Sequence, residues 1–149
     1  MRVPREEVNF PSPIVLDPYA PTPLSRRDRE IARRGGLLAV DCSWNRLHAR
    51  GAFPGVAPGP RPPPNHRRLP LLIATNPHHY GRVAELNTVE AFSAALYILG
   101  RPGEAERLME GFRGGSEFLK VNRARLDLYR AAPSSLAISD AERTLFGGA

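Results

Sequence analysis

The chain has 149 residues, 42% of them hydrophobic, which is enough for one domain or for a small α/β domain with a helical appendage. Its 21 lysines and arginines against 15 acidic residues give a net charge of +6, which favours an anionic partner, nucleic acid before an acidic lipid surface. A single cysteine excludes an internal disulfide and a multi-cysteine zinc site, and no apolar stretch approaches the roughly 20 residues of a transmembrane helix.

The first ten residues lack the apolar core of a signal peptide, so we expect a cytoplasmic protein. The apolar run PIVLDPYA at 13–20 then predicts a buried strand that Pro18 stops. Ser25 can cap a helix through RRDREIARR, which two glycines end. The run LLAVDCSW at 37–44 predicts a second strand. This strand–helix–strand order indicates a parallel βαβ unit.

Residues 45–68 are rich in proline and cannot form a central strand or a helix. We expect a long irregular loop there, and in a compact domain such a loop is usually either functional or disordered. The apolar run LPLLIAT at 69–75 predicts a third strand, buried on both faces as parallel strands often are.

The rest of the chain predicts helices. Their ends are marked by capping residues, glycines and prolines: Asn87 with Glu90, then Gly100; Pro102, then Gly114 and Gly115; Ser116, then Pro133; and a short last helix within 139–146. The predicted organisation is therefore an α/β domain over 1–82 and an all-α domain over 83–149.

Polar or proline-rich turns follow all three predicted strands. They are LDPYAP at 16–21, DCSWN at 41–45 and TNPHHYG at 75–81. In open parallel sheets, ligands bind beyond the C-terminal ends of the strands. Every α/β protein has such turns, but their convergence here favours a ligand site at this edge.

Asp41 and Trp44 are the most unusual pair in these turns. An indole can stack on a planar ligand while a carboxylate accepts a proton or orients a donor. Equally, Trp44 can belong to the core while Asp41 caps a turn or pairs with an arginine. Cys42 is more often a small buried residue than a nucleophile, since no partnered base is visible for it.

The histidines at 66, 78 and 79 match no metal-ligand spacing, so we predict no metal site. The stretch GRPGEAERLMEG at 100–111 lacks the preceding strand and the lysine of a phosphate-binding loop, which argues against an ATPase and a dinucleotide enzyme. Almost all the positive charge is arginine, which suits bidentate phosphate recognition. A GC-rich genome or heat adaptation would produce the same bias, and a run of charges is usually a solvated helix surface.

Several separated motifs occur in the order of one enzyme family: LDP at 16–18, VDCSWN at 40–45, HRRLPLLIATNPHHYG at 66–81, LNTVEAFSAALYILG at 86–100 and FLKVN at 118–122. With these motifs the chain resembles the small-subunit rRNA aminocarboxypropyltransferases over about residues 13–130. The resemblance implies a SPOUT-like α/β domain, with a parallel sheet and a deep trefoil knot, and an all-α C-terminal domain. It implies transfer of the 3-amino-3-carboxypropyl group of S-adenosylmethionine to N3 of an (N1-methyl)pseudouridine, with release of methylthioadenosine.

The resemblance also assigns roles to matching positions. Asp41 is expected beside the transferred group and the target base, where it takes the N3 proton or aligns the base. Cofactor binding is expected of apolar side chains, backbone groups and the NP-x-x-YG turn, at Leu16, Pro18, Trp44, Leu72, Ile73, Ala74, Asn76, Tyr80 and Leu99. Candidate contacts to rRNA phosphates are Arg26, Arg27, Arg50, Arg61, Arg67 and Arg68.

Two features depart from the family pattern. Family members usually begin with an additional strand and a basic, glycine-containing segment that holds the aminocarboxypropyl end, and this chain starts too late to contain them. An aromatic–glycine pair expected after Arg113 is replaced by Gly114 and Gly115. We expect a monomer that binds small-subunit rRNA or the pre-ribosomal small subunit and no membrane. Two alternatives stay open, a SPOUT RNA methyltransferase and a non-catalytic RNA-binding or ribosome-assembly module.

Overall fold

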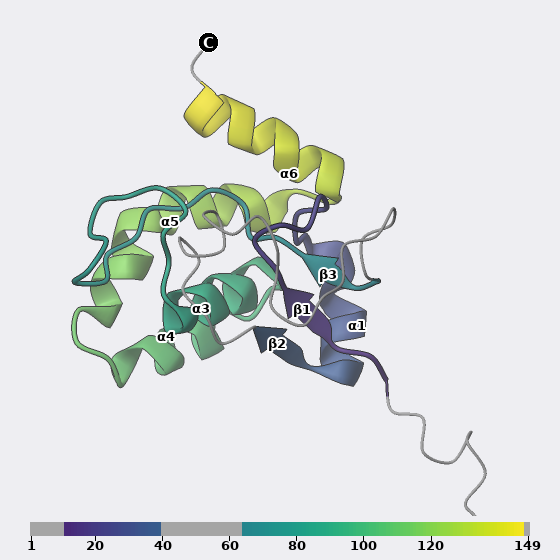
Figure 1. Cartoon of the computed structure of the whole chain (residues 1–149), viewed down its shortest axis with the longest axis horizontal. Helices are drawn as coiled ribbons and strands as arrows, with labels where there is room; N and C mark the ends of the chain where they lie inside the picture. Colours follow the sequence, from purple (N-terminus) through teal and green to yellow (C-terminus); the bar gives the residue numbers. More distant parts are fainter. Residues whose placement is uncertain (1–10, 40–63, 148–149) are drawn as a thin grey trace, which may run out of the picture.

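The computed structural model describes residues 11–39 and 64–147. A small parallel sheet, in the order β2-β1-β3, lies at its centre (Figure 1). β1 (Ile14–Leu16) is flanked by β2 (Leu37–Ala39) and β3 (His66–Arg67). The register places the last residue of β1 opposite the last residues of both neighbours, so the three strands end level with one another. The parallel βαβ unit predicted from the sequence is confirmed.

The helix between β1 and β2 begins where its capping residue predicts. The Ser25 hydroxyl accepts a backbone N–H at 3.3 Å, and the Asp28 carboxylate accepts the N–H of Ser25 at 3.1 Å. A turn of 3-10 helix (Arg26–Asp28) then leads into α1 (Arg29–Gly35). Gly36 ends α1 because its φ of 84° lies in the left-handed region that glycine enters without strain.

The expected third strand is wrong in its position. The strand that pairs with β1 is β3, whereas segment 69–75 runs outside the parallel ladder. One side of this segment pairs with the returning chain, where the N–H of Ala84 donates to the carbonyl of Leu72 at 2.9 Å. Its other side bonds to a helix side chain, because Asn122 accepts the N–H of Ile73 at 2.9 Å and donates to its carbonyl at 2.8 Å. The apolar pattern thus marks a buried extended segment whose neighbour is a helix.

Helices dominate the described chain after residue 87. They are α3 (Thr88–Ile98), α4 (Pro102–Glu110), α5 (Gly115–Ala131) and α6 (Ser135–Glu142), followed by a π-helical turn (Arg143–Gly147). The Asn87–Glu90 capping box and the proline in the first turn of α4 are confirmed. Two starts differ from the prediction, since α5 begins after Gly114 rather than at a Ser116 cap and Ser134 caps α6 earlier than expected.

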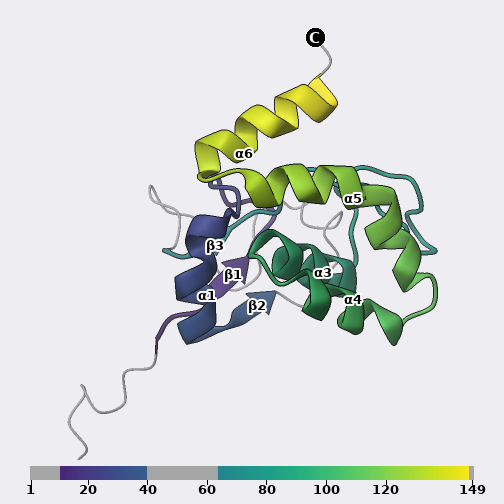
Figure 2. The same ribbon diagram turned by 180° about the vertical axis from the view of Figure 1, so that it is seen from behind.

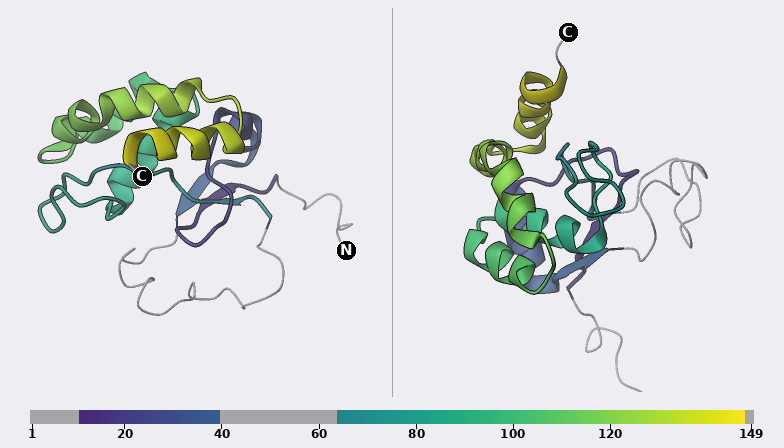
Figure 3. Two further views of the ribbon diagram at one scale, coloured as in Figure 1. Left: turned by 90° about the horizontal axis from the view of Figure 1, so that it is seen from above. Right: turned by 90° about the vertical axis from the view of Figure 1, so that its left-hand side faces the viewer.

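The helices and the sheet share one hydrophobic core. α1 contacts β1 and α3 contacts β2, while α3, α4 and α5 contact one another (Figures 1 and 2). α6 lies over α5 and alongside it (Figure 3). Fully buried members of the core come from the sheet, segment 69–75 and three helices: Ile14, Leu16, Leu72, Ile98, Phe118, Leu126 and Ile138. Within the described ranges, no helix has the length and apolar character needed to cross a membrane.

Candidate functional site at the C-terminal edge of the sheet

The chain leaves the sheet at one edge after all three strands. Leu16 pairs with Ala39 on one side and with Arg67 on the other, so the residues that follow them start from the same edge. This arrangement is the one in which parallel sheets bind ligands. Asp41 and Trp44, the pair singled out in the sequence, lie outside the described residues, as do Arg50 and Arg61.

The turn after β1 is held by a buried carboxylate. Asp17 is 4% exposed, accepts the N–H of Tyr19 at 2.8 Å and lies 2.9 Å from Nδ1 of His66. The backbone carbonyl of Asp17 also accepts the N–H of Ala20 at 3.0 Å. This turn directs Pro18 towards a cavity that opens beyond β1 and β3.

That cavity, called here the edge cavity, has a volume of about 160 Å³. It is lined by Pro18, Arg68, Leu69, Pro70, Leu71, Ala84 and Leu86. Whole ligands usually need about 300 Å³ or more, so the edge cavity suits one ring system of a larger ligand. Among the predicted cofactor-binding residues that the structure describes, Pro18 lines it.

Two backbone groups in this lining have no hydrogen-bond partner among the described residues, which makes them candidates to bind a ligand. Within residues 11–39 and 64–147, neither the N–H of Leu69 nor the C=O of Ala84 takes part in a hydrogen bond. Ala84 has a φ of 65°, an uncommon conformation for a residue with a side chain. Its own N–H is used by Leu72, which leaves the carbonyl as the available group. Leu69, Ala84 and Leu86 are not among the residues predicted from the sequence, because an unpaired backbone group has no signature there.

The predicted backbone contacts at Leu72, Ile73 and Ala74 stay a prediction. Both backbone polar groups of Ile73 are bonded to Asn122. The carbonyl of Leu72 accepts from Ala84, and Ala74 accepts from Gly81 at 2.7 Å. Leu16, Leu72 and Ala74 are fully buried in the core that supports the edge cavity.

The NP-x-x-YG turn is fastened to the start of α3 by one acid. Glu90 is 2% exposed and accepts the N–H of Thr75 at 2.8 Å and the side-chain amide of Asn76 at 2.8 Å. The amide of Asn76 also donates to the carbonyl of Glu85 at 3.1 Å, and its oxygen accepts the N–H of His79 at 3.0 Å. Asn76 therefore shapes the turn with every polar atom of its side chain, which agrees with a supporting role.

Tyr80 and Leu99 lie in different surroundings from the edge cavity. Tyr80 is 60% exposed and donates to the carboxylate of Glu117, which raises the pKa of Tyr80. Leu99 lines a second cavity of about 500 Å³, between α1, α3 and α4, that shares no lining residue with the edge cavity. Neither residue lines the edge cavity, and their cofactor roles stay predictions.

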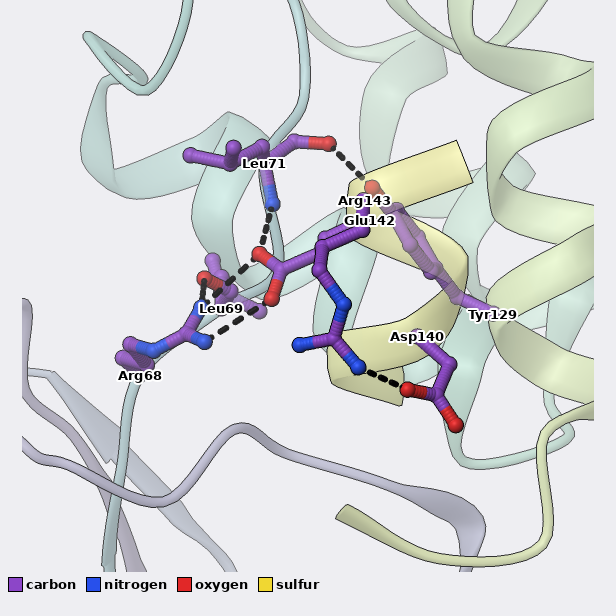
Figure 4. Close-up of polar contacts among 7 residues, drawn as sticks. All are labelled: Arg68, Leu69, Leu71, Tyr129, Asp140, Glu142 and Arg143. Carbon is purple, nitrogen blue, oxygen red and sulfur yellow. Dashed lines mark hydrogen bonds and ion pairs between the residues drawn. The ribbon is translucent and has the colours of Figure 1, made fainter. Parts of the chain in front are cut away.

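The arginines predicted to bind rRNA divide into two kinds. Arg26 and Arg27 are exposed and make no ion pair within the described ranges. Arg67 instead lies 3.1 Å from Asp28, a buried carboxylate. Arg68 is held by a second buried carboxylate, from α6, at 2.8 Å (Figure 4). Arg26 and Arg27 are therefore better placed than Arg67 and Arg68 to bind phosphates.

The histidines are dispersed among separate contacts. His66 pairs with Asp17, and Nδ1 of His79 lies 3.2 Å from Glu85, whereas His78 is exposed. The part of the chain that the structure describes contains no group of three or more His, Cys, Asp or Glu side chains that could hold a metal ion.

Comparison with known proteins identifies the family. Residues 14–146 match the family model described as "Ribosome biogenesis protein, C-terminal". The 16S rRNA aminocarboxypropyltransferase of Methanopyrus kandleri is 48% identical over 126 residues, which are 84% of this chain and 70% of that protein. The chain belongs to the rRNA aminocarboxypropyltransferase family. The resemblance noted in the sequence is thereby confirmed.

Relatives of this family extend from archaea to a eukaryote. The 18S rRNA aminocarboxypropyltransferase of Schizosaccharomyces pombe is 38% identical over 87% of this chain and 43% of that protein. The solved structure of the SAM-dependent rRNA:acp-transferase Tsr3 from Vulcanisaeta distributa matches with a TM-score of 0.68 and 34% identity, covering 98% of this chain and 83% of that one. The mixed α/β fold with a small parallel sheet is therefore a family feature.

Proposed function

We propose that this chain is an S-adenosylmethionine-dependent rRNA aminocarboxypropyltransferase. The observation that carries the proposal is 48% identity to a 16S rRNA aminocarboxypropyltransferase over most of the chain, together with likeness to a solved SAM-dependent rRNA:acp-transferase. The substrate is small-subunit rRNA, modified at N3 of an (N1-methyl)pseudouridine during ribosome biogenesis, and methylthioadenosine leaves. Family membership also supports a SPOUT-like fold with a trefoil knot, divided at about residue 82 into α/β and helical domains.

The edge cavity fits the adenine ring of S-adenosylmethionine. An adenine edge presents a ring nitrogen that accepts a hydrogen bond beside an amino group that donates one. The free N–H of Leu69 and the free C=O of Ala84 supply the complementary pair. Pro18 and Leu86 supply apolar walls for the ring. Backbone groups at residues 69 and 84 thus join the predicted cofactor-binding set.

Regiospecificity would follow from how the cofactor is oriented. All three carbons on its sulfonium are open to attack, so the protein needs only to decide which one meets the nucleophile. With the adenosine held in the edge cavity and the amino-acid arm directed outward, N3 of the target base attacks the γ-carbon. The bond from that carbon to sulfur breaks, sulfur keeps the electron pair, and N3 loses its proton. Asp41, two residues beyond the end of β2 in the sequence, is our candidate to take that proton or to align the base.

A labelling experiment tests the reaction directly. The full chain is incubated with a small-subunit rRNA transcript that carries the hypermodified base and with S-adenosylmethionine labelled in its carboxyl group. Label on the RNA, with methylthioadenosine as the other product, is the expected result. S-adenosylhomocysteine and unlabelled RNA would identify a methyltransferase, and failure to bind S-adenosylmethionine would identify a non-catalytic RNA-binding module.

A further inference from the structure

A buried carboxylate from the C-terminal helix joins the two ends of the segment that lines the edge cavity. Glu142, at the end of α6, is 7% exposed. Its Oε1 accepts from Nη2 of Arg68 at 2.8 Å, while its Oε2 accepts from Nη1 of Arg68 at 2.9 Å and from the N–H of Leu71 at 2.9 Å (Figure 4). Such bidentate, charge-assisted bonds are stronger and more directional than neutral ones. We call these three bonds the Glu142 bridge.

Other bonds fix both ends of the same segment, 68–71. The hydroxyl of Tyr129, on α5, donates to the carbonyl of Leu71 at 2.7 Å (Figure 4). Burial raises the pKa of Tyr129, so this hydroxyl stays protonated as the donor. At the other end, the backbone of Arg68 bonds to residues 22 and 24 at 3.0 and 2.8 Å. Between these anchors, Leu69 lines the edge cavity, and its N–H has no hydrogen-bond partner among the described residues.

We propose that Glu142 is a positioning residue for cofactor binding, although it does not line the edge cavity itself. The Glu142 bridge holds segment 68–71 in the conformation that presents the N–H of Leu69 to the adenine ring. A donor that is already oriented loses little conformational entropy when the ligand binds, so affinity is higher than with a mobile segment. This role rests on the proposed function, because the ligand is the adenosine part of S-adenosylmethionine.

The variant Glu142→Gln tests the role with little change of volume. A side-chain amide has one acceptor oxygen where the carboxylate has two, so in either orientation its NH₂ group faces an N–H donor of Arg68. The bidentate, charge-assisted pair with Arg68 is therefore lost. A matched control is Asp28→Asn. Asp28 is also buried, at 6% exposed, and pairs with Arg67 at 3.1 Å, but it bonds to no residue of segment 68–71. Both variants lose a buried arginine–carboxylate pair.

Dissociation constants for S-adenosylmethionine and for methylthioadenosine are measured by calorimetry on the full chain, without RNA. Circular dichroism gives the folded fraction of each variant, which corrects the binding data for any loss of stability. We expect Glu142→Gln to weaken the binding of both ligands roughly tenfold, about the effect of losing one well-placed hydrogen bond. Asp28→Asn is expected to bind both ligands as the parent does. Hydrogen exchange at the Leu71 amide should accelerate in Glu142→Gln alone.

The outcomes separate the two proposals. Parental affinity in Glu142→Gln would overturn the positioning role and leave the proposed function standing. Equal weakening in Asp28→Asn would overturn it as well, because any buried pair would then matter equally. A parent chain that binds neither ligand would refute the proposed function, and the positioning role with it.

Discussion

Replacing Asn122 with alanine should destabilise the fold far more than a change on the surface of α5. Asn122 is fully buried, and its side-chain amide takes the place of a neighbouring strand for Ile73. It accepts one backbone bond from Ile73 at 2.9 Å and returns another at 2.8 Å. A third bond, to the carbonyl of Phe118 at 3.0 Å, fixes the amide on its own helix. Alanine removes all three bonds and supplies none.

The size of the loss follows from the two backbone groups left without partners. Each unpaired buried group costs about 1–3 kcal/mol, so the N–H and C=O of Ile73 together cost about 2–6 kcal/mol. Alanine regains about 0.5 kcal/mol through its higher helix propensity. Ile73 is only half-buried, so water can partly replace the amide and the lower half of this range applies. We therefore expect a net loss of about 1.5–3.5 kcal/mol, a large part of the roughly 5–15 kcal/mol that holds a domain folded.

Urea unfolding followed by far-ultraviolet circular dichroism measures this loss. Lys120→Ala, at an exposed position of the same helix, is the control and should change the free energy of unfolding by less than about 0.5 kcal/mol. Asn122→Asp keeps the acceptor for Ile73 but lacks the donor when ionised, so it should regain stability once acid protonates the new carboxyl group. A loss below about 1 kcal/mol in Asn122→Ala would show that α5 does not support segment 69–75 in this way.

Three further predictions concern pH, RNA and the two residues singled out in the sequence. The pKa of Tyr129 is raised above its unfolded value near 10. Its contribution to the free energy of unfolding is therefore complete below pH 10 and is lost as the pH rises further. In urea titrations at alkaline pH, the free energy of unfolding of Tyr129→Phe should fall less steeply with pH than that of the parent. Changing Arg26 and Arg27 to alanine should reduce the slope of log affinity for rRNA against log salt by about one each in filter-binding assays, and an unchanged slope would exclude phosphate contacts there. Asp41→Ala should lower turnover more than cofactor affinity, whereas Trp44→Ala should weaken cofactor binding; equal turnover in Asp41→Ala would remove its assignment.

Local signals in the sequence predicted the helices well. Ser25, Asn87 and Glu90 act through bonds within the first turn of a helix, so their effect is visible in a few adjacent residues. The predicted start of α5 is two residues late, because Ser116 is a preferred cap whereas the left-handed Gly114 takes that position. Family membership was also recognisable, since its motifs are short and occur in a fixed order.

Segment 69–75 shows what an apolar pattern leaves open. Its residues predicted a buried strand, and burial is what an apolar run reports. Which groups bond its backbone depends on side chains more than forty residues later. Asn122 and Tyr129 are seven residues apart on α5, on the face that also carries Phe118 and Leu126. An amide or hydroxyl at such a core-facing position of a helix needs a hydrogen-bond partner. These two polar residues were therefore the available signal that α5 bonds to another segment of the chain.

The Glu142 bridge has a consequence for how the enzyme matures during synthesis. Leu71 leaves the ribosome long before its partner, which follows seventy-one residues later. Contacts so distant along the chain form late, because the intervening polypeptide must first be gathered into place. If the Glu142 bridge positions the adenine-binding segment as proposed, a nascent chain that has built its sheet and first helix is still unable to recognise adenosine. The ability to bind S-adenosylmethionine would then be acquired last, when α6 brings Glu142 to segment 68–71.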